Sequence, residues 1–585
     1  MEKKFSLWVH SHTVLKKLIM ELKIAIFIIV VSVSNVLTIA SVTEPQQNRI
    51  TGTVIEMNGT PLPGVNVVVT GTTLGTMTDI AGKYSIEVPE GTKSLTFTFV
   101  GMQPQEINIG TLAQINVTMA ESAFGLEEVV VIGYGTVKKS DLTGSVSSVT
   151  SEALSAYPTL GATQAIQGRI AGVMVTTTTG EPGVGSRIRI RGGTSINASS
   201  DPLYVVDGFA GGVEPPAEDI ESIEILKDAS ATAIYGSRGA NGVVLITTKS
   251  GKLGKTKIDF NSSYSTQQVG KKLDLLNGQQ FAEYINEVYS NDGQSNIPLP
   301  NPEQYGKGTN WQDQIFRTGV LQNYQLSANG GQENFKFYSS VNYYDNKGIV
   351  INSNYKRISG TTNLDIKIND HVKFGTKNYF MRTTDNGARS ASENEGTGVI
   401  ASAMRFEPIQ GVYDENGNYT IATIGDPIDN PVANAREKQN NTVSDLFQQN
   451  SFVEIDFLKD FVFRSTVGFN ILNGRNGIYI PTTLNAGRNT GGSASISSVK
   501  NTIILNENYL TYNKTINESN KINLMAGYSY QSSRAEYWNA SNQNFITNSF
   551  SYWNLGAGSV FQSPSSGLTE WTLASFYGHF SRPVH

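Results

Sequence analysis

The second half of the chain alternates apolar and polar residues over many short runs, and this pattern limits its fold more than any other feature. One run places Phe335, Phe337 and Val341 on one face, with Lys336 and Asn342 on the other. Successive side chains of a β-strand point to opposite faces, so a period of two predicts strands with a single apolar face. The same alternation occurs in five further runs: 364–368, 372–380, 453–457, 461–469 and 522–530.

These runs predict a transmembrane antiparallel β-barrel over residues 255–585. Loops rich in Asn, Gly and Asp separate them, some as long as 383–442, and the chain holds 25 Tyr and 25 Phe. One-sided apolar strands, uneven loops and aromatic strand ends are typical of outer-membrane barrels. A soluble β-sandwich or β-solenoid would show the same alternation and is the alternative. After residue 42 no apolar run is long enough for a membrane helix, so a membrane-spanning form of this chain would have to be a barrel.

The first forty residues, 1–40, are interpreted as a signal peptide. Lysines precede an apolar core at Ile24–Val33, and Thr38–Ala40 resembles a small-residue cleavage site. The alternative is a transmembrane anchor over Ile24–Val42, which is long enough to span a bilayer. Polar residues such as Ser32 dilute that stretch, which favours the signal peptide and therefore export from the cytoplasm.

Residues 49–120 predict a small β-sandwich, because short strand-like runs alternate with close turns. Motifs such as Pro63–Val67 and Gly82–Tyr84 resemble the carboxypeptidase-regulatory-like domain. Asp79 and Gly82 predict an Asx-type turn rather than a binding site. The strand-like runs are Arg49–Met57, Val65–Val69, Lys83–Val88, Ser94–Val100 and Ile115–Met119.

Four consecutive β-branched residues, Val129 to Ile132, stand in the segment 126–135 and favour an extended backbone. Two interpretations are open. The run could be a strand of the next domain, which the residues alone favour. It could also be an isolated strand whose free main-chain groups complete the sheet of another protein.

Residues 137–251 predict an α+β globule of ordinary domain size. The run Arg187–Arg191 alternates charged and apolar residues, which predicts a strand with Arg187, Arg189 and Arg191 on one face. Further strands are expected at Tyr204–Gly208 and Gly242–Lys249. Helical patterns are found at Leu154–Ile170, Ala217–Ile225 and Ala229–Tyr235.

Three motifs in this order resemble the SusC/RagA-type TonB-linked outer-membrane transporters of Bacteroidetes. Glu128–Gly135 resembles a TonB box, and Arg187–Gly193 resembles the arginine-rich strand of the plug domain of such receptors. Asp201–Gly208, Ile220–Asp228 and Ala233–Val244 closely resemble the plug signature of this family. The carboxypeptidase-regulatory-like domain is the usual N-terminal extension of the same family. The resemblance therefore covers the chain from the export signal to the barrel.

The resemblance implies TonB-dependent import of a large nutrient, an oligosaccharide or a peptide, across the outer membrane. The plug would fill the barrel lumen, and a SusD-like lipoprotein would cap the barrel. TonB, driven by ExbB and ExbD, would pair with the box and pull on the plug. The TonB-contact residues would be Glu128, Val129, Val130, Val131, Ile132, Gly133 and Tyr134.

The charged residues of the plug are candidates for ion pairs between the plug and the barrel, ordinary surface charges being the alternative. Removing one partner of a buried pair is costly, although the intact pair adds little net stability. The candidates are Arg187, Arg189, Arg191, Arg238, Glu221, Glu224 and Asp228.

The barrel is expected to be only partly present. Plugged transporters of this type have 22 strands, whereas about ten strand-like runs follow residue 255. Family members also end in a terminal aromatic residue, and His585 is not one. The chain is therefore interpreted as the N-terminal part of a transporter, with about half of its strands. A non-functional truncated fragment is the corresponding alternative function.

Composition and motifs argue against several other functions. The net charge of −5 and the absence of a basic stripe argue against nucleic-acid binding. With no cysteine, the chain has neither a disulfide nor a zinc–thiolate site. The five histidines lack metal-ligand spacing, and no HExxH, GxSxG or P-loop is present, so neither an enzyme nor a cofactor is expected. The acidic run at Asp414–Asn418 fits a hairpin turn better than a calcium loop. A secreted β-rich adhesin would explain the strands but not the plug motifs.

Overall fold

The structure is a computed structural model, and its chain divides into two compact units, Met1–Glu127 and Glu128–His585. Each unit is considered by itself. The predicted signal peptide lies outside the described residues. The residues described are 48–57, 59–70, 72, 74–89, 91–99, 102–110, 112–120, 129–132, 135–138, 146–154, 161–177, 179–192, 199–387, 398–517 and 520–581.

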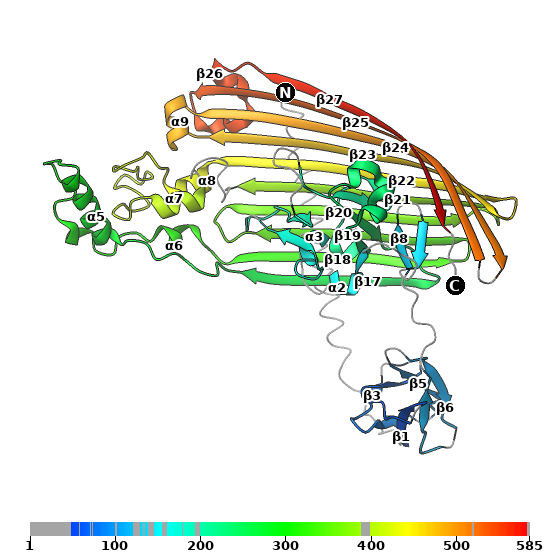
Figure 1. Ribbon diagram of the computed structural model, residues 1–585. Coiled ribbons are helices and arrows are strands. Elements are labelled where there is room, and N and C mark those ends of the chain that lie inside the picture. The colour runs from blue at the N-terminus through cyan, green and yellow to red at the C-terminus, as the bar shows by residue number, and fades with distance from the viewer. Residues whose placement is uncertain are drawn as a thin grey trace, which may run out of the picture. The chain divides into compact units, whose positions relative to one another are not determined.

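The first unit is a small β domain of two sheets, ordered β4-β1-β7 and β3-β2-β5-β6 (Figure 1). Its core is formed by the alternating apolar residues of these strands, among them Ile50, Val67, Tyr84 and Phe97. The predicted turn is confirmed, because Asp79 Oδ1 accepts the amides of Ala81 and Lys83 at 2.9 Å each. The strands are β1 (Asn48–Glu56), β2 (Asn66–Val69), β3 (Gly75–Met77), β4 (Lys83–Val88), β5 (Ser94–Thr98), β6 (Gln105–Asn108) and β7 (Val117–Met119).

The second unit opens with a separate two-stranded sheet, in which β8 (Val129–Ile132) pairs antiparallel with β9 (Gly135–Lys138). The globular part that follows, here called the plug, is built on a five-stranded sheet ordered β10-β15-β16-β13-β14, with β11 and β12 forming a hairpin of their own. Its elements are β10 (Val146–Thr150), α2 (Ser151–Leu154), α3 (Ala162–Ala165), β11 (Val173–Thr176), β12 (Arg187–Ile190), β13 (Leu203–Val206), β14 (Phe209–Ala210), η2 (Ala217–Asp219), β15 (Ile220–Leu226), α4 (Ala229–Thr232), η3 (Ala233–Gly239) and β16 (Val243–Thr248).

The helix expected at Ala217–Ile225 is wrong. Only the three residues of η2 are helical, and the rest of the segment forms β15. This strand lies between β10 and β16 in the middle of the plug sheet, where Ile223, Ile225 and Leu226 are all buried. A strand that is buried on both faces does not alternate between apolar and polar residues. Its sequence pattern therefore resembles that of a buried helix. The helix expected at Ala229–Tyr235 is confirmed as α4 and the start of η3.

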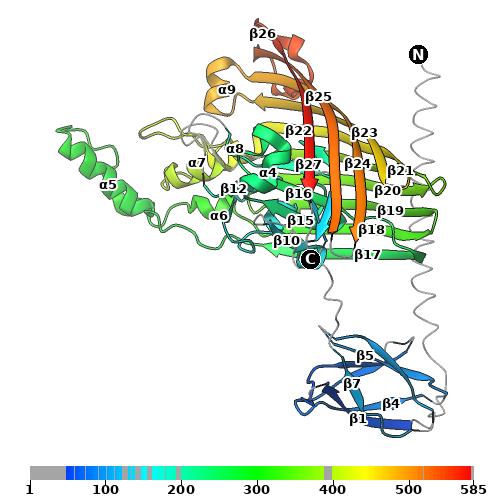
Figure 2. The ribbon, with the colours of Figure 1, turned by 45° about the vertical axis from the view of Figure 1, so that its right-hand side comes forward.

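The remainder of the second unit is an antiparallel sheet, here called the wall, which has eleven strands within the described residues. Figures 1 and 2 show these strands lying side by side in sequence order and curving along their length. The described sheet does not close, since β17 pairs only with β18, and β27 only with β25. Its strands are β17 (Gly254–Gln267), β18 (Gly319–Gln332), β19 (Phe335–Lys347), β20 (Ser353–Lys367), β21 (Val372–Gly387), β22 (Gln439–Phe457), β23 (Phe461–Ile480), β24 (Ser493–Asn517), β25 (Asn520–Phe545), β26 (Gly558–Phe561) and β27 (Ser565–Ser581).

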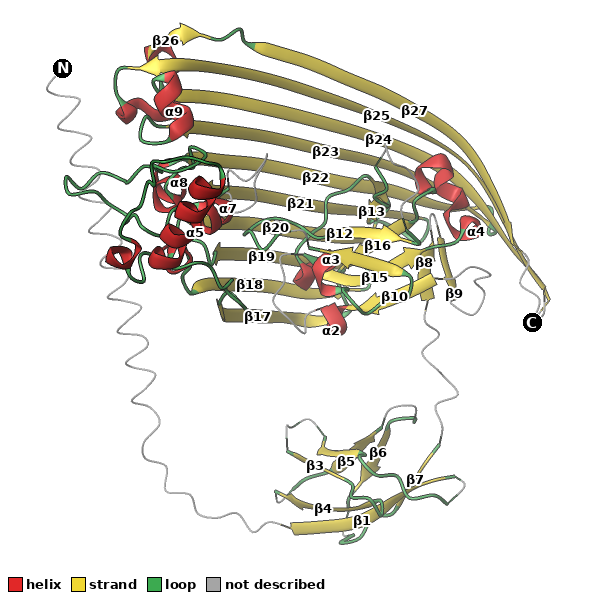
Figure 3. Cartoon of the chain, turned by 60° about the vertical axis from the view of Figure 1, so that its left-hand side comes forward, coloured by secondary structure: helices red, strands yellow, loops and turns green. Residues whose placement is uncertain are grey.

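Short turns join the wall strands at one end, and longer connections that contain helices join them at the other (Figure 3). This asymmetry is typical of outer-membrane barrels. Among the described residues, no helix is both long enough and apolar enough to cross a membrane. The run Asp414–Asn418 lies in one of these connections and is a turn, because Asp414 Oδ1 accepts the amides of Asn416 and Asn418. The helices are α5 (Gly278–Asn291), η4 (Pro302–Tyr305), α6 (Trp311–Ile315), α7 (Val399–Arg405), α8 (Pro431–Glu437), α9 (Asn485–Thr490), η5 (Asn548–Trp553) and η6 (Leu555–Ala557).

Candidate functional site: the contact between plug and wall

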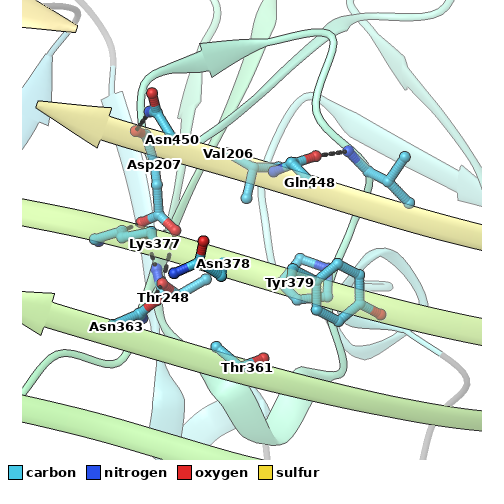
Figure 4. Close-up of a pocket in the computed structure, with 12 residues that line it drawn as sticks. Val206, Asp207, Thr248, Thr361, Asn363, Lys377, Asn378, Tyr379, Gln448 and Asn450 are labelled. Carbon is cyan, nitrogen blue, oxygen red and sulfur yellow. Dashed lines mark hydrogen bonds and ion pairs between the residues drawn. The ribbon is translucent and has the colours of Figure 1, made fainter. Parts of the chain in front are cut away.

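The plug meets the inner face of the wall mainly through one acidic segment, residues 207–219. Figure 3 shows the plug lying against the curved sheet, and Figure 4 shows the part of the contact around Asp207. The alternation of each wall strand directs every second side chain toward the plug. These inward positions include amides, hydroxyls and the cations Arg357 and Lys377.

Asp219 is the most heavily bonded plug residue in this contact. It ends the short helix η2, its side chain is buried, and only 1% of the residue is exposed. Its Oδ1 accepts hydrogen bonds from Gln325 Nε2 (2.7 Å), Tyr338 OH (2.8 Å) and Ser340 Oγ (2.7 Å). Its Oδ2 accepts one from Thr361 Oγ1 (2.8 Å). Three neighbouring wall strands, β18, β19 and β20, therefore hold one carboxylate, which satisfies its acceptor capacity without a cation.

Asp207 forms an ion pair with the wall. It follows β13 at a tight turn, where its φ is +51°. Its Oδ1 lies 2.6 Å from Lys377 Nζ on β21, and Oδ2 accepts from Thr248 Oγ1 at 2.7 Å. The Asp207 carbonyl accepts from Asn450 Nδ2 on β22 at 2.6 Å. Side chain and backbone of one turn residue are thus bonded to two wall strands (Figure 4).

Two glutamates complete the acidic segment. Glu218 accepts from Asn323 Nδ2 on β18 at 2.5 Å. Glu214 is half-buried in the plug, where it accepts from the amide and the hydroxyl of Thr163 at 2.5 and 2.9 Å. Burial raises the pKa of Glu214, and these bonds together with the charge of Arg357 on β20 oppose that rise. Asp207 thus pairs with a lysine of the wall, whereas Asp219 and Glu218 accept from neutral wall donors.

Apolar packing and further polar contacts attach the other edge of the plug. Phe209 of β14 lies against the backbone of Gly468 on β23, where an added Cβ would come within 2.5 Å of the Phe209 ring. Gln531 Nε2 on β25 donates to the Ala210 carbonyl at 2.9 Å. Arg238, one of the candidate arginines, donates to Gln531 Oε1 and so contacts the wall through a hydrogen bond.

A small cavity lies between plug residues 206–215 and strands β20 to β22. Asp207 and Lys377 stand at this cavity together with hydroxyl and amide side chains (Figure 4). Val206, Val213 and Pro215 contribute apolar surface to the same lining. It is lined by Val206, Asp207, Val213, Pro215, Thr248, Thr361, Asn363, Lys377, Asn378, Tyr379, Gln448 and Asn450.

Seven charged plug residues were proposed from the sequence to form ion pairs with the barrel. The structure places most of them elsewhere. Arg191 pairs with Asp228, so this ion pair joins two parts of the plug and not plug to wall. Glu221 lies 3.5 Å from Lys252, in the connection between plug and β17, and both side chains are substantially exposed. Strand β12 directs its two other arginines to its exposed face, because Ile188 and Ile190 occupy the buried one.

Glu224 is buried on β15 inside the plug sheet. The acidic plug residues that meet wall donors are thus other residues than the candidates Glu221, Glu224 and Asp228. The sequence alone identifies only some of the acidic residues that join the plug to the wall. Asp207 stands in the plug motif 201–208, whereas Asp219 and Glu218 follow no motif and looked like part of a helix.

The predicted TonB-contact segment is described only in part. Val129 to Ile132 form β8, as expected for a strand. Glu128, Gly133 and Tyr134 lie outside the described residues. No cluster of acidic or histidine side chains suited to a metal ion occurs within the described ranges.

Known families and proteins match the first unit, the plug and the wall. The family model of the CarboxypepD_reg-like domain matches residues 50–131, and that of the TonB-dependent Receptor Plug Domain matches residues 138–243. The TonB-dependent receptor P3 of Formosa agariphila is 46% identical over 550 residues, which are 93% of this chain and 54% of that protein. The TonB-dependent receptor SusC of Bacteroides thetaiotaomicron is 40% identical over 391 residues, 64% of this chain and 37% of that protein.

The fold also matches a solved transporter. The structure of the RagAB peptide importer in its open-open state superposes with a TM-score of 0.68 and 26% identity, over 78% of this chain and 55% of that one. The chain spans about half the length of the curated relatives it matches. None of these relatives is named as an enzyme, in agreement with the lack of a catalytic motif.

Proposed function

We propose that this chain is part of a TonB-dependent receptor of the SusC type and supplies the plug and part of the barrel wall of a TonB-driven importer in the outer membrane. The observation that carries the proposal is the acidic contact between plug and wall. The plug is attached to the inner face of the sheet by side-chain hydrogen bonds and an ion pair, without a cysteine in either part. Such an attachment can be broken and formed again.

The energetics of this contact suit a plug that has to move. A hydrogen bond to a charged group contributes about 1.5–3 kcal/mol, so several together keep the plug seated at rest. Once the segment moves, water can replace each bond. We infer that TonB, driven by ExbB and ExbD, supplies the work through residues 128–134, which precede the first strand of the plug.

The proposed substrate is a large nutrient, an oligosaccharide or a peptide. The relationship to SusC-type receptors supports an oligosaccharide, which is the common expectation for that family. The resemblance to the RagAB peptide importer supports the alternative. A SusD-like lipoprotein is the proposed partner on the outer side, where the long connections of the wall would lie.

Uptake assays in the native organism test this function. Cells that lack the gene and cells that lack TonB should both lose uptake of the same fluorescently labelled substrate, and membrane fractionation should place the protein in the outer membrane. Parallel assays with labelled oligosaccharides and labelled peptides identify the substrate class. Recovery of the protein in the soluble periplasm, or uptake that does not depend on TonB, would contradict the proposal.

A further inference from the structure

The face of the wall that points away from the plug, here called the outer face, can be followed from strand to strand. Gln448 of β22 accepts from the plug amide of Val213, and Gln531 of β25 donates to the plug carbonyl of Ala210. Successive side chains of a strand point to opposite faces, so the outer face holds odd-numbered residues of β22 and even-numbered residues of β25. The register extends this assignment to the odd-numbered residues of β23 and the even-numbered residues of β24.

A mainly apolar belt covers part of this outer face. On β22 it runs from Phe447 to Phe457, which are both exposed, and on β23 it covers Phe461–Ile471. Gln449 and Ser451 interrupt the belt and are bonded to each other. Its extent on each strand matches the roughly 9–11 residues with which a tilted strand crosses the apolar part of a bilayer. Strands β24 and β25 have 25 and 26 residues, so both extend well beyond the belt toward the long connections.

Beyond the belt, the outer face carries exposed cations on three neighbouring strands. Arg534 of β25 is compensated, because it pairs with Glu536 at 2.5 Å and with Glu570 at 2.8 Å. Lys500 of β24 faces Glu536 in the register, but that carboxylate is bonded to Arg534. In the part of the chain that the structure describes, neither Lys500 nor Arg475 of β23 forms an ion pair. Two uncompensated positive charges therefore stand on adjacent strands.

Two exposed tryptophans lie beside these cations. Trp538 of β25 is in the same row of the register as Arg475, since Arg475 pairs with Ser498 and Ser498 pairs with Trp538. Trp553 ends η5, and Arg475 Cζ lies 5.0 Å from the centroid of its ring. The preceding residue, Tyr552, packs against β23 and so holds η5 on the outer face. The exposed fractions of the two tryptophans are 47% and 64%.

Arg475, Lys500, Trp538 and Trp553 are here called the outer patch. We propose that the outer patch binds the head group of a phosphorylated glycolipid in the outer leaflet of the membrane. Arg475 and Lys500 contact phosphate through charge-assisted hydrogen bonds, and the acyl chains lie along the apolar belt. The tryptophan rings pack against the apolar faces of the sugar rings. The inference goes beyond nutrient import, and it rests on the proposed position of the wall in the outer membrane.

The composition of the outer patch favours a glycolipid over a phospholipid. Both lipids offer phosphate to the two cations, but only the glycolipid also offers sugar rings to the tryptophans. A phospholipid head group would leave both aromatic faces in contact with water. Apolar surface that stays exposed in one place, with polar residues around it, is typical of a binding surface.

Single substitutions can test the outer patch, because its side chains are exposed and their loss should leave the fold intact. Lys500→Gln removes one of the uncompensated charges. Arg382→Gln is the matched control, since Arg382 also points outward, on β21, but pairs with Asp445 at 3.6 Å. Trp538→Ala removes one aromatic face. The assay is binding of fluorescently labelled lipopolysaccharide to the purified protein in detergent, with labelled phosphatidylglycerol measured in parallel.

We expect Lys500→Gln to weaken lipopolysaccharide binding by about tenfold, the factor equivalent to one lost hydrogen bond to a charged group. Arg382→Gln should change binding by no more than about twofold, since its charge is already compensated. Trp538→Ala should weaken the binding of lipopolysaccharide but not that of phosphatidylglycerol.

Three results would overturn the inference. Lys500→Gln could cause no loss, or the same loss as Arg382→Gln, and the two uncompensated charges would then have no special part in binding. An equal effect of Trp538→Ala on both lipids would show that the patch does not select a glycolipid. Unchanged protein that binds neither lipid, yet supports TonB-dependent uptake, would overturn the lipid site and leave the proposed function in place.

Discussion

Asp219 shows how much of the plug attachment can depend on a single side chain. Four donors from three strands converge on its carboxylate, and no cation takes part. A charge that is compensated only by neutral donors requires all of them to be in place, because each one missing leaves part of the charge uncompensated. The wall strands thus position Asp219, and Asp219 in turn positions η2 and the start of β15.

Replacement of Asp219 should loosen the plug. Asp219→Ala removes the acceptor and leaves four buried donors without it, at a cost of about 1–3 kcal/mol for each donor that water cannot reach. We expect cells carrying this variant to admit a large antibiotic that the outer membrane normally excludes, even when TonB is absent. Growth inhibition by that antibiotic is the measurement.

Glu221→Ala provides the matched control for this prediction. Glu221 lies two residues further along the chain and forms only a substantially exposed pair with Lys252. Pairs of this kind contribute about 0–1 kcal/mol, so antibiotic entry should stay at the level of the unchanged protein. Equal entry for both variants would show that Asp219 does not hold the plug.

At the scale of elements, strand β12 shows that a correct strand prediction does not determine what its side chains contact. The alternation at 187–191 predicted a strand, and β12 is one. Its arginines were expected to reach the wall. However, β12 pairs only with β11, and the apolar residues of β12 need the plug core, so the arginines face outward.

The double variant Arg187→Ala, Arg189→Ala should therefore retain a seated plug. The two side chains are exposed, and exposed substitutions away from such contacts change stability by about 0.5 kcal/mol or less. Protease digestion of purified protein should cut the variant plug no faster than the unchanged plug. Faster cutting would indicate that these arginines do anchor the plug.

The first unit allows a separate test at the scale of a domain. Burial raises the pKa of Tyr84 to about 12, and its hydroxyl donates to the Ile115 carbonyl at 2.9 Å. The ordinary pKa of tyrosine is 10.0. Because the folded pKa is raised, this contribution to stability is complete below pH 10 and is lost as the pH rises toward 12. The shift corresponds to roughly 2–3 kcal/mol.

Tyr84→Phe should remove this pH dependence. Phenylalanine keeps the ring in the core beside Phe97 but has no group that ionises. Urea unfolding of residues 48–127 can be monitored by circular dichroism at pH 8 to 11.5. The free energy of unfolding should fall steeply with rising pH for the unchanged domain and less steeply for the variant. Parallel curves would exclude Tyr84 as the titrating group.

At the scale of the whole second unit, the two sides of the plug are attached differently. One side continues through residues 249–253 into β17 and is bonded to β18, β19 and β20 through Asp219. The other side faces β20 to β22 across the small cavity. The continuous side should act as the hinge, and the side with the cavity should separate first.

Cross-linking the two sides tests this asymmetry. The pair Val213→Cys and Gln448→Cys spans the cavity side, where the Val213 amide donates to Gln448 at 3.0 Å. The pair Glu218→Cys and Asn323→Cys spans the other side. A short, reducible thiol cross-linker should block uptake in the first pair much more than in the second, and reduction should restore it. The 585 residues contain no cysteine to interfere. Equal block in both pairs would contradict a hinge on the side of β18 to β20.

The sequence by itself determined the local features of this protein. A period of two predicts strands wherever one face is buried, and this holds for the wall strands β19 to β23 and β25 and for most strands of the first unit. The Asp79 turn also follows from its own residues, because its hydrogen bonds reach only four positions along the chain. The family motifs identified the plug for the same reason, since each is a short continuous segment.

Only the tertiary structure decided which charges meet. Asp219 lies more than a hundred positions from the residues that hold it, and no periodicity relates such distant positions. The wall strands are also longer than their alternating patterns, because pairing with a neighbour extends a strand past the point where its composition indicates one. Local structure follows from interactions between near neighbours in the chain, whereas the contact between plug and wall depends on how separate elements are brought together.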